Sequence, residues 1–225
     1  MKVKQYLLAS AICVVPFAAS AAPPTPFTWT GLYIGANGGA FSQSTTARNL
    51  DGFFPVGPAD DQSVFGGTGG LFGFTVGYNY QMNHYVFSLE TDIAASTVND
   101  NYTYRRMGFD ITTSSKLSSL GTIRGRFGYA LNNVLFYVAG GFAYGHVNNE
   151  LQVGDWAARS LSTSGMRTGW TVGGGLDYAV ANNWIVRAEV IYVDLGTVTG
   201  TNRSGCSFAF SNTYTGGRIA AVYKY

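Results

Sequence analysis

The chain is poor in charged residues, cysteine, histidine and long apolar runs. Charged residues make up 12% of its 225 positions, and it holds two cysteines and two histidines. So few imidazoles and thiols, with no metal-ligand spacing, predict neither a metal site nor a bound cofactor. After the first 21 residues no stretch reaches the roughly 18 apolar residues that a membrane-spanning helix needs. The sequence therefore excludes a helical anchor in the remainder of the chain.

The N-terminus has the pattern of a secretory signal. Lys2 and Lys4 precede an apolar run over residues 6–17, and Ala19-Ser20-Ala21 supplies small residues at a cleavage site. We expect residues 1–21 to be a cleaved signal peptide, so that the mature protein is exported.

Removal of the signal changes both the charge and the cysteine count. The mature chain keeps 12 basic and 12 acidic residues because Lys2 and Lys4 are lost. A neutral chain predicts no nucleic-acid partner. Cys206 is then the single cysteine, which excludes an intramolecular disulfide.

Apolar and polar side chains alternate with a period of two from about Phe72 to the C-terminus, and the charges share one parity. In residues 184–195, for example, Arg187 and Glu189 alternate with Val186 and Val190. Period-two alternation indicates strands. The charged face is rich in glycine and alanine, which suits a narrow lumen, whereas the opposite face carries the large aromatic residues and suits lipid. This pattern is typical of an outer-membrane β-barrel.

Eight segments follow this rule, and their connections alternate in length. The predicted strands are Trp29–Phe41, Gly69–Tyr80, Tyr85–Ser96, Lys116–Tyr129, Val134–His146, Gly165–Tyr178, Trp184–Leu195 and Thr213–Tyr225. Three connections are short (81–84, 130–133 and 179–183) and four are long and polar (42–68, 97–115, 147–164 and 196–212). We therefore predict an all-β, eight-stranded antiparallel transmembrane barrel over residues 22–225, with short periplasmic turns, four long outer loops and both termini in the periplasm.

The inward-facing charges are predicted to lie in one layer of the lumen. Counted from the nearest turn or terminus, they have similar heights, and acids balance arginines: Glu90, Asp92, Asp177 and Glu189 against Arg124, Arg126, Arg187 and Arg218. One interpretation is a gated pore whose ion pairs exchange partners. The other, which we prefer, is a static polar core in a lumen just wide enough for side chains.

Several segments together resemble a known family. They are WTGLYIGANGG, LGTIRGRFGYA, FYVAGGFAYG, GWTVGGGLDYAVANNW, AEVIYVDLG and GGRIAAVYKY, and they resemble the small outer-membrane β-barrel proteins of alphaproteobacteria, around the 25 and 31 kDa surface antigens and the haemin-binding proteins. The resemblance covers nearly the whole mature chain and implies an OmpA-like barrel in the outer membrane. It also implies that Ile219, Tyr223 and Tyr225 form the C-terminal signal read by the outer-membrane assembly machinery.

The outer loops are the predicted place for recognition. Aromatic and basic residues there could form a rim for haemin, glycan or protein, or could instead belong to the aromatic girdle: Phe53, Phe54, Tyr102, Tyr104, Arg105, Arg106 and Trp156. Met107 and Phe109 belong to the same predicted loop as Tyr102, Tyr104, Arg105 and Arg106.

Catalysis is not predicted. His84 lies in a periplasmic turn. His146 has Ser160, Ser162 and Glu150 nearby in sequence but no nucleophile motif around it.

The sequence thus predicts a non-enzymatic outer-membrane barrel with an envelope-structural and surface-interaction role, antigen-like or adhesin-like, whose lumen is plugged by ion pairs. Its surroundings would be outer-membrane lipid and lipopolysaccharide, and its outer loops could bind a host or surface ligand. A small or gated porin-like channel and a haemin-binding surface receptor are the alternatives.

Overall fold

The computed structural model describes residues 27–51, 62–106, 109–153, 161–201, 205 and 207–225, and all its regular elements are strands. They are β1 (Gly31–Asn49), β2 (Gln62–Phe65), β3 (Thr68–Met82), β4 (Tyr85–Ser96), β5 (Asn99–Arg106), β6 (Phe109–Leu131), β7 (Val134–Val153), β8 (Leu161–Ala179), β9 (Trp184–Thr201) and β10 (Ser207–Lys224). In the described ranges no helix is long and apolar enough to cross a membrane.

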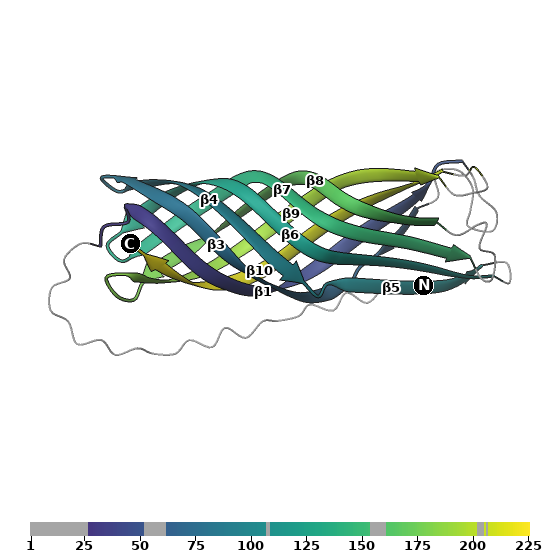
Figure 1. The fold of residues 1–225 in the computed structure, drawn as a ribbon, viewed down its shortest axis with the longest axis horizontal. Helices are drawn as coiled ribbons and strands as arrows, with labels where there is room; N and C mark the ends of the chain where they lie inside the picture. Colours follow the sequence, from purple (N-terminus) through teal and green to yellow (C-terminus); the bar gives the residue numbers. More distant parts are fainter. Residues whose placement is uncertain (1–26, 52–61, 107–108, 154–160, 202–204, 206) are drawn as a thin grey trace.

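Eight of these strands close into a ring, seen side-on in Figure 1. Each pairs antiparallel with its neighbour in the order β1, β3, β4, β6, β7, β8, β9 and β10, and β10 pairs again with β1. A sheet in the hydrocarbon core of a membrane has to close on itself, because no water is available there to hydrogen-bond an unpaired backbone group. The predicted antiparallel barrel is confirmed, and two short strands, β2 and β5, are added outside the ring.

The alternation of the sequence decides which side chains face outward. On β8 and β9 the side chains of Val172 and Val190 are 46% and 64% exposed, whereas Asp177 and Arg187 are buried. Aromatic residues gather on the same outer face and contact one another across strands, as Phe87 does with Phe127 and Trp184 with Tyr223. The large exposed apolar side chains therefore cover the outside of the ring, as the lipid-facing band of a barrel requires.

The strands run further than the alternation predicted. Towards the outer end, β1 continues to Asn49, β7 to Val153 and β9 to Thr201, while β6 begins at Phe109. Strands β2 and β5 also lie in segments that we predicted to be loop. Strand β2, QSVF, is too short to show an alternation, and in β5, NDNYTYRR, the tyrosines share their parity with Asp100 and Arg106, so the alternation rule detects neither.

Two β-bulges mark the level at which this longer part begins. On β6 the register shifts by one residue at Ser118, and on β9 it shifts at Leu195 and Gly196. Gly196 has φ +69°, a conformation that favours glycine, and its N–H donates to Asp194 Oδ1 at 2.7 Å. Bulges bend a strand and increase its twist, so both walls change direction here.

Beyond the bulges the ring opens into two sheets. The pairing of β8 with β9 ends at Trp170 and Asp194, so the outer part of β8 pairs only with β7 among the described residues, and that of β9 only with β10. One sheet is β2, β1, β10 and β9, and the other is β5, β6, β7 and β8. We call this part the outer extension: residues 43–49, 62–65, 99–106, 109–117, 147–153, 161–169, 195–201 and 207–212.

Candidate functional site: a layered lumen

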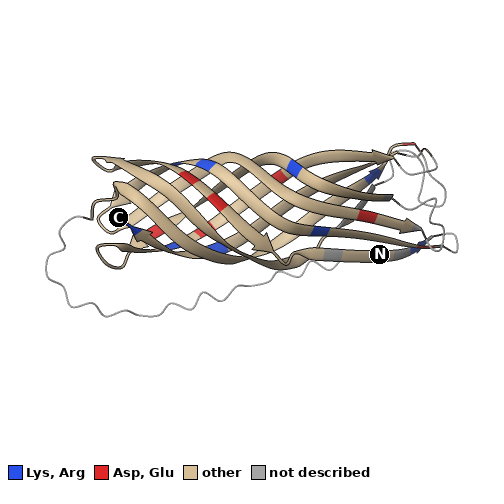
Figure 2. Ribbon diagram, in the orientation of Figure 1, with Lys and Arg blue, Asp and Glu red and all other residues tan. Residues whose placement is uncertain are grey.

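The eight charged residues predicted for the lumen all lie inside the ring. They come from β4, β6, β8, β9 and β10, and each is at most 8% exposed. Figure 2 shows red and blue segments lying near one another on several strands in the half of the barrel nearer the C-terminus, with further charged residues toward the other end. The short turns end that half, which is therefore the periplasmic half of a barrel in this family of folds.

Some ion pairs join residues that are directly opposite on adjacent strands. Glu90 pairs in register with Arg124, and Arg124 Nη2 donates to Glu90 Oε1 at 2.6 Å. Asp177 is opposite Arg187, which donates through Nε and Nη2 to both carboxylate oxygens at 2.8 and 3.0 Å. The fork geometry matches a bidentate carboxylate contact, the stronger kind of charged hydrogen bond.

The same arrangement holds for a third pair. Arg218 lies opposite Glu189 and donates through Nε to Glu189 Oε2 at 2.6 Å. Its Nη2 also lies 3.3 Å from Asp92 Oδ2.

Other ion pairs cross the lumen between strands that are not neighbours. Arg124 Nη1 on β6 donates to Glu189 Oε1 on β9 at 2.5 Å, and Arg126 Nη2 donates to Asp177 Oδ2 on β8 at 2.8 Å. Arg187 Nη1 donates to Glu90 Oε2 on the far wall. Strand adjacency predicts two separate charge groups, one on β4 and β6 and one on β8 to β10, whereas the structure joins them into one network.

Neutral side chains complete the network, and sequence reasoning missed them. Tyr33 donates its hydroxyl to Glu90 Oε2 at 2.7 Å, and Thr122 donates to Asp92 Oδ2 at 2.7 Å. The Arg126 guanidinium lies 3.7 Å from the centroid of the Tyr137 ring, a cation–π distance. The alternation of each strand places Tyr33, Thr122 and Tyr137 on the inward face. An inward-facing tyrosine at the height of the charges is the sequence feature from which these contacts could have been predicted.

Apolar layers lie on both sides of the charged layer. On the periplasmic side Trp29 is 0% exposed and packs in a cluster with residues from around the ring. Its backbone N–H donates to Gln81 Oε1 at 2.8 Å, and its indole N–H to the Asn132 carbonyl at 3.4 Å. The cluster is Trp29, Tyr33, Val86, Ala130, Leu135, Ala179, Ile185, Ala220 and Val222.

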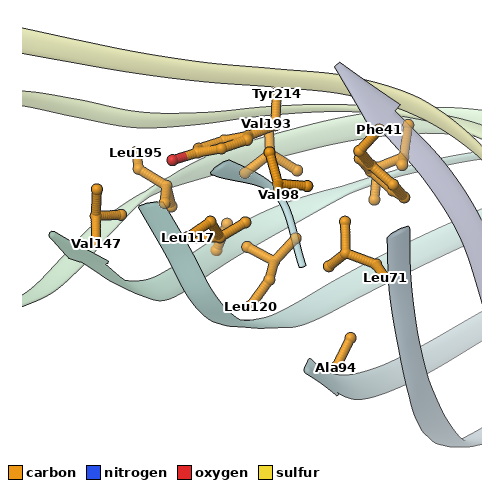
Figure 3. Close-up of a cluster of buried hydrophobic side chains, with 12 residues drawn as sticks. Phe41, Leu71, Ala94, Val98, Leu117, Leu120, Val147, Val193, Leu195 and Tyr214 are labelled. Atoms are coloured by element: carbon orange, nitrogen blue, oxygen red, sulfur yellow. The ribbon is translucent and has the colours of Figure 1, made fainter. Parts of the chain in front are cut away.

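The outer apolar layer is thicker. Figure 3 shows its side chains directed inward from several strands, with Leu195 and Leu117 near Tyr214. Between this layer and the charged layer lies a cavity of about 10 Å³, bordered by Asn37 and Arg218, roughly the size of one water molecule. The layer is Phe41, Leu71, Ala94, Val98, Leu117, Leu120, Ala143, Val147, Ile191, Val193, Leu195 and Tyr214.

A neutral polar layer follows in the outer extension and joins its two sheets. Gln43 on β1 donates to Ser115 on β6 at 2.5 Å, and Ser115 donates to Asn149 on β7 at 2.7 Å. Thr45 donates to Asn212 on β10 at 3.0 Å. A last apolar cluster of Ile111, Leu151, Phe208 and Phe210 lies beyond it.

The other predicted site residues have different positions. Tyr102, Tyr104, Arg105 and Arg106 lie on strand β5 rather than in a loop. Phe53, Phe54, Trp156 and Cys206 lie outside the described residues, as does the predicted signal peptide.

Of the two serines considered above for the outer histidine, Ser160 lies outside the described residues, and the hydrogen-bond partner found for His146 is Ser164 rather than Ser162. His146 Nε2 lies 3.3 Å from Ser164 Oγ, which donates to Asn148, and the group is exposed.

At the C-terminus, Ile219 and Tyr225 are exposed on the outer face. The Tyr223 ring lies between those of Trp184 and Tyr225, at 5.2 and 5.1 Å.

The closed ring, its apolar exterior and its polar interior define a transmembrane β-barrel. The chain belongs to the family of the outer membrane protein beta-barrel domain, whose model matches residues 7–215. It is therefore an outer-membrane protein.

Two relatives and one solved structure show the extent of the similarity. The 31 kDa outer-membrane immunogenic protein of Brucella melitensis is 35% identical over 198 residues, covering 84% of this chain and 81% of that protein. The 22 kDa outer membrane protein of Rhizobium leguminosarum bv. viciae is 30% identical, covering 78% and 69%. The crystal structure of OprG from Pseudomonas aeruginosa has a TM-score of 0.53 at 14% identity, covering 88% and 99%. The predicted resemblance to the small alphaproteobacterial antigens is confirmed.

Proposed function

We propose that this protein is a non-conducting, non-enzymatic barrel that strengthens the outer membrane and presents its outer extension at the cell surface. The observation that carries this proposal is the filled lumen. The charged layer lies between two apolar layers, and each arginine in it contacts at least one carboxylate. Water and ions would have to displace all three layers to cross.

The charge balance of the layer supports a structural role for it. Four arginines and four acids neutralise one another, so no net charge attracts a permeating ion. Glu90 alone accepts from three arginines and from Tyr33. Because removing one partner of a buried pair leaves an uncompensated charge, such a network resists rearrangement.

The exterior supports the proposed partners. Its apolar band fits outer-membrane lipid. The polar outer extension would then stand at the level of the lipopolysaccharide head groups. The aromatic C-terminus, with Ile219, Tyr223 and Tyr225, fits a signal for the assembly machinery. The names of the Brucella relatives as immunogenic proteins support exposure of the homologous region to antibodies.

Single-channel recording tests the closed lumen. In planar bilayers we expect at most small and infrequent openings, with a general porin as the conducting control. The variant Leu117→Ala/Leu195→Ala thins the outer apolar layer and should still conduct poorly, because the charged layer remains. A steady porin-like conductance of the wild-type protein would contradict the proposal and favour a channel.

The chain offers a simple test of its orientation. Lys116 and Lys224 are the only lysines after the predicted signal peptide, one in the exposed outer extension and one buried at the periplasmic end. A membrane-impermeant amine-reactive biotin on intact cells should label Lys116 and not Lys224. The Lys116→Arg variant is the control that should lose this label. Labelling of Lys224 alone would show that the barrel has the opposite orientation in the membrane.

A further inference from the structure

The outer extension has unpaired strand edges where its two sheets separate. Past Trp170 and Asp194, residues 161–169 of β8 pair with β7 on one side only, and residues 196–201 of β9 pair with β10 on one side only, among the described residues. These two edges face the same seam, because β8 and β9 are neighbours in the ring below it. The two strands still touch at the base of this seam, where a Cβ on Gly196 would lie 3.5 Å from the Thr168 carbonyl oxygen. A further strand can therefore enter only beside residues 161–167 and 197–201. An unpaired edge offers a row of backbone donors and acceptors to another strand.

The two edges lack the features that normally prevent pairing. Proteins protect edges with charges, proline or very short strands. The β8 edge, LSTSGMRTG, extends over nine residues with one charge, Arg167, and the β9 edge, GTVTGT, has none. Neither contains proline. By contrast β2 has four residues, and β5 carries Arg105, Arg106 and Asp100.

The directions of the two strand edges limit which kind of segment can pair with both of them. A strand between β8 and β9 would run antiparallel to one edge and parallel to the other, because the two strands are antiparallel. Both of its own edges would have to be free. A second copy of this barrel cannot supply such a strand from its described wall, since each long strand there pairs along much of its length with a neighbour. An extended, otherwise unpaired peptide segment fits this requirement.

We propose that the seam between β8 and β9 binds an extended peptide segment of another protein at the cell surface by strand addition. Main-chain hydrogen bonds to both edges would give the affinity, and the two adjoining sheets would give the specificity. Arg167 is half-buried on the lumen side of the β8 edge, and its Nε has no hydrogen-bond partner. This nitrogen is buried, so the guanidinium would have to turn toward the seam to donate to a carbonyl or a carboxylate of the incoming segment. This inference rests on the proposed surface exposure but not on the closed lumen.

A peptide copied from the chain itself tests the seam. The probe is a fluorescently labelled LGTVTGT, the sequence of residues 195–201, which can continue the antiparallel pairing along β8. Its control is the same peptide with N-methyl groups at alternate residues, which removes donors on one edge. Binding to the full-length barrel in lipid nanodiscs is followed by anisotropy, and hydrogen exchange locates the bound segment.

We expect the unmodified peptide to bind and to slow amide exchange about tenfold or more over residues 162–167 and 197–201, with no change over β5. The N-methylated peptide should not bind. The inference is overturned by an absence of binding, by protection on β5 instead, or by edges that are already as protected as the closed ring. Self-association of the free barrel through this seam would also overturn it, by making a second copy the occupant.

Two proline variants test the edge from the side of the barrel. Adjacent strand residues point their N–H groups to opposite sides, so one of Ser164→Pro and Gly165→Pro removes a donor to the seam and the other removes one to β7. Both variants are compared for folding by heat-modified migration. The variant that folds like wild type should bind the peptide at least about tenfold more weakly, which is about 1.4 kcal/mol. Unchanged binding by a well-folded pair would contradict the proposed site.

Discussion

The barrel contains two polar layers that join its opposite walls by different means. In the periplasmic half the layer is ionic, inside a fully paired ring, and its carboxylates and arginines contact several partners each. In the outer extension the layer is neutral and lies between two sheets with open edges. Each layer leaves single buried atoms without a hydrogen-bond partner, Arg124 Nε and Arg126 Nε in the ionic one and Gln43 Oε1 and Asn149 Nδ2 in the neutral one. The layers differ in charge, because a buried charge needs an opposite charge beside it and a buried amide does not.

The surroundings explain where each arrangement occurs. The ionic layer lies at a level where the outer wall faces lipid, so the ring must be closed. The outer extension stands in water and head groups, which can hydrogen-bond an open strand edge. Closure ends at Trp170 and Asp194, close to the bulges at Ser118 and Gly196. The bulges in β6 and β9 therefore lie close to the level at which the closed ring ends and the two separate sheets begin.

The largest expected effect comes from removing the charge of Glu90. Glu90→Gln keeps the shape of the side chain but leaves Arg124, Arg126 and Arg187 short of one anion. We expect the free energy of unfolding to fall by about 3–5 kcal/mol, because uncompensated charges remain buried. Urea titration in lipid vesicles measures it. A loss below about 1 kcal/mol would show that the ionic layer behaves like the neutral one.

A charge on the outer face should distinguish the two regions by their environment. Val172→Arg places a guanidinium against lipid and should cost about 2–4 kcal/mol near the bilayer midplane, enough to impair assembly. Ser162→Arg is the matched control, because it lies on the same strand and is exposed on the outer face of the extension. Equal assembly of the two variants, measured by heat-modified migration, would overturn the assignment of the membrane band.

The smallest effect is expected in the neutral layer. Ser115→Ala removes a hydroxyl that bonds Gln43 and Asn149. We expect a loss of about 1 kcal/mol, since only neutral hydrogen bonds are removed and no charge is left uncompensated. The same vesicle titration measures it. A cost as large as that of Glu90→Gln would remove the distinction between the layers.

Much of the ring could be predicted because lipid imposes a simple rule on each strand. The parity that buries Asp177 and exposes Val172 is visible in the sequence, and short turns fix the register that sets Asp177 opposite Arg187. The same rule fails above the membrane. It does not detect β5, because Tyr102 and Tyr104 share their parity with the charged residues Asp100 and Arg106, and it cannot follow parity through the bulge at Ser118.

The site was less predictable than the ring. Adjacent pairs follow from strand order, but the contacts of Arg124 with Glu189 and of Arg126 with Asp177 depend on which walls face each other across the lumen. That depends on tilt and stagger in the closed barrel, which no local pattern contains. The apolar layers were also missed. Leu195 lies on the parity that was expected to be polar, whereas Leu117 has the outward parity of Ile123 in the sequence and is turned inward by the bulge at Ser118.

A double-mutant cycle between Arg124 and Glu189 tests most directly whether the charged layer bridges the lumen. The variants Arg124→Gln, Glu189→Gln and the double variant are compared with the wild-type protein in the vesicle unfolding assay. The short contact between the two side chains, at 2.5 Å across the barrel, predicts that the double variant loses less stability than the sum, with a coupling of about 0.5–3 kcal/mol. Additive losses would contradict a network that connects opposite walls.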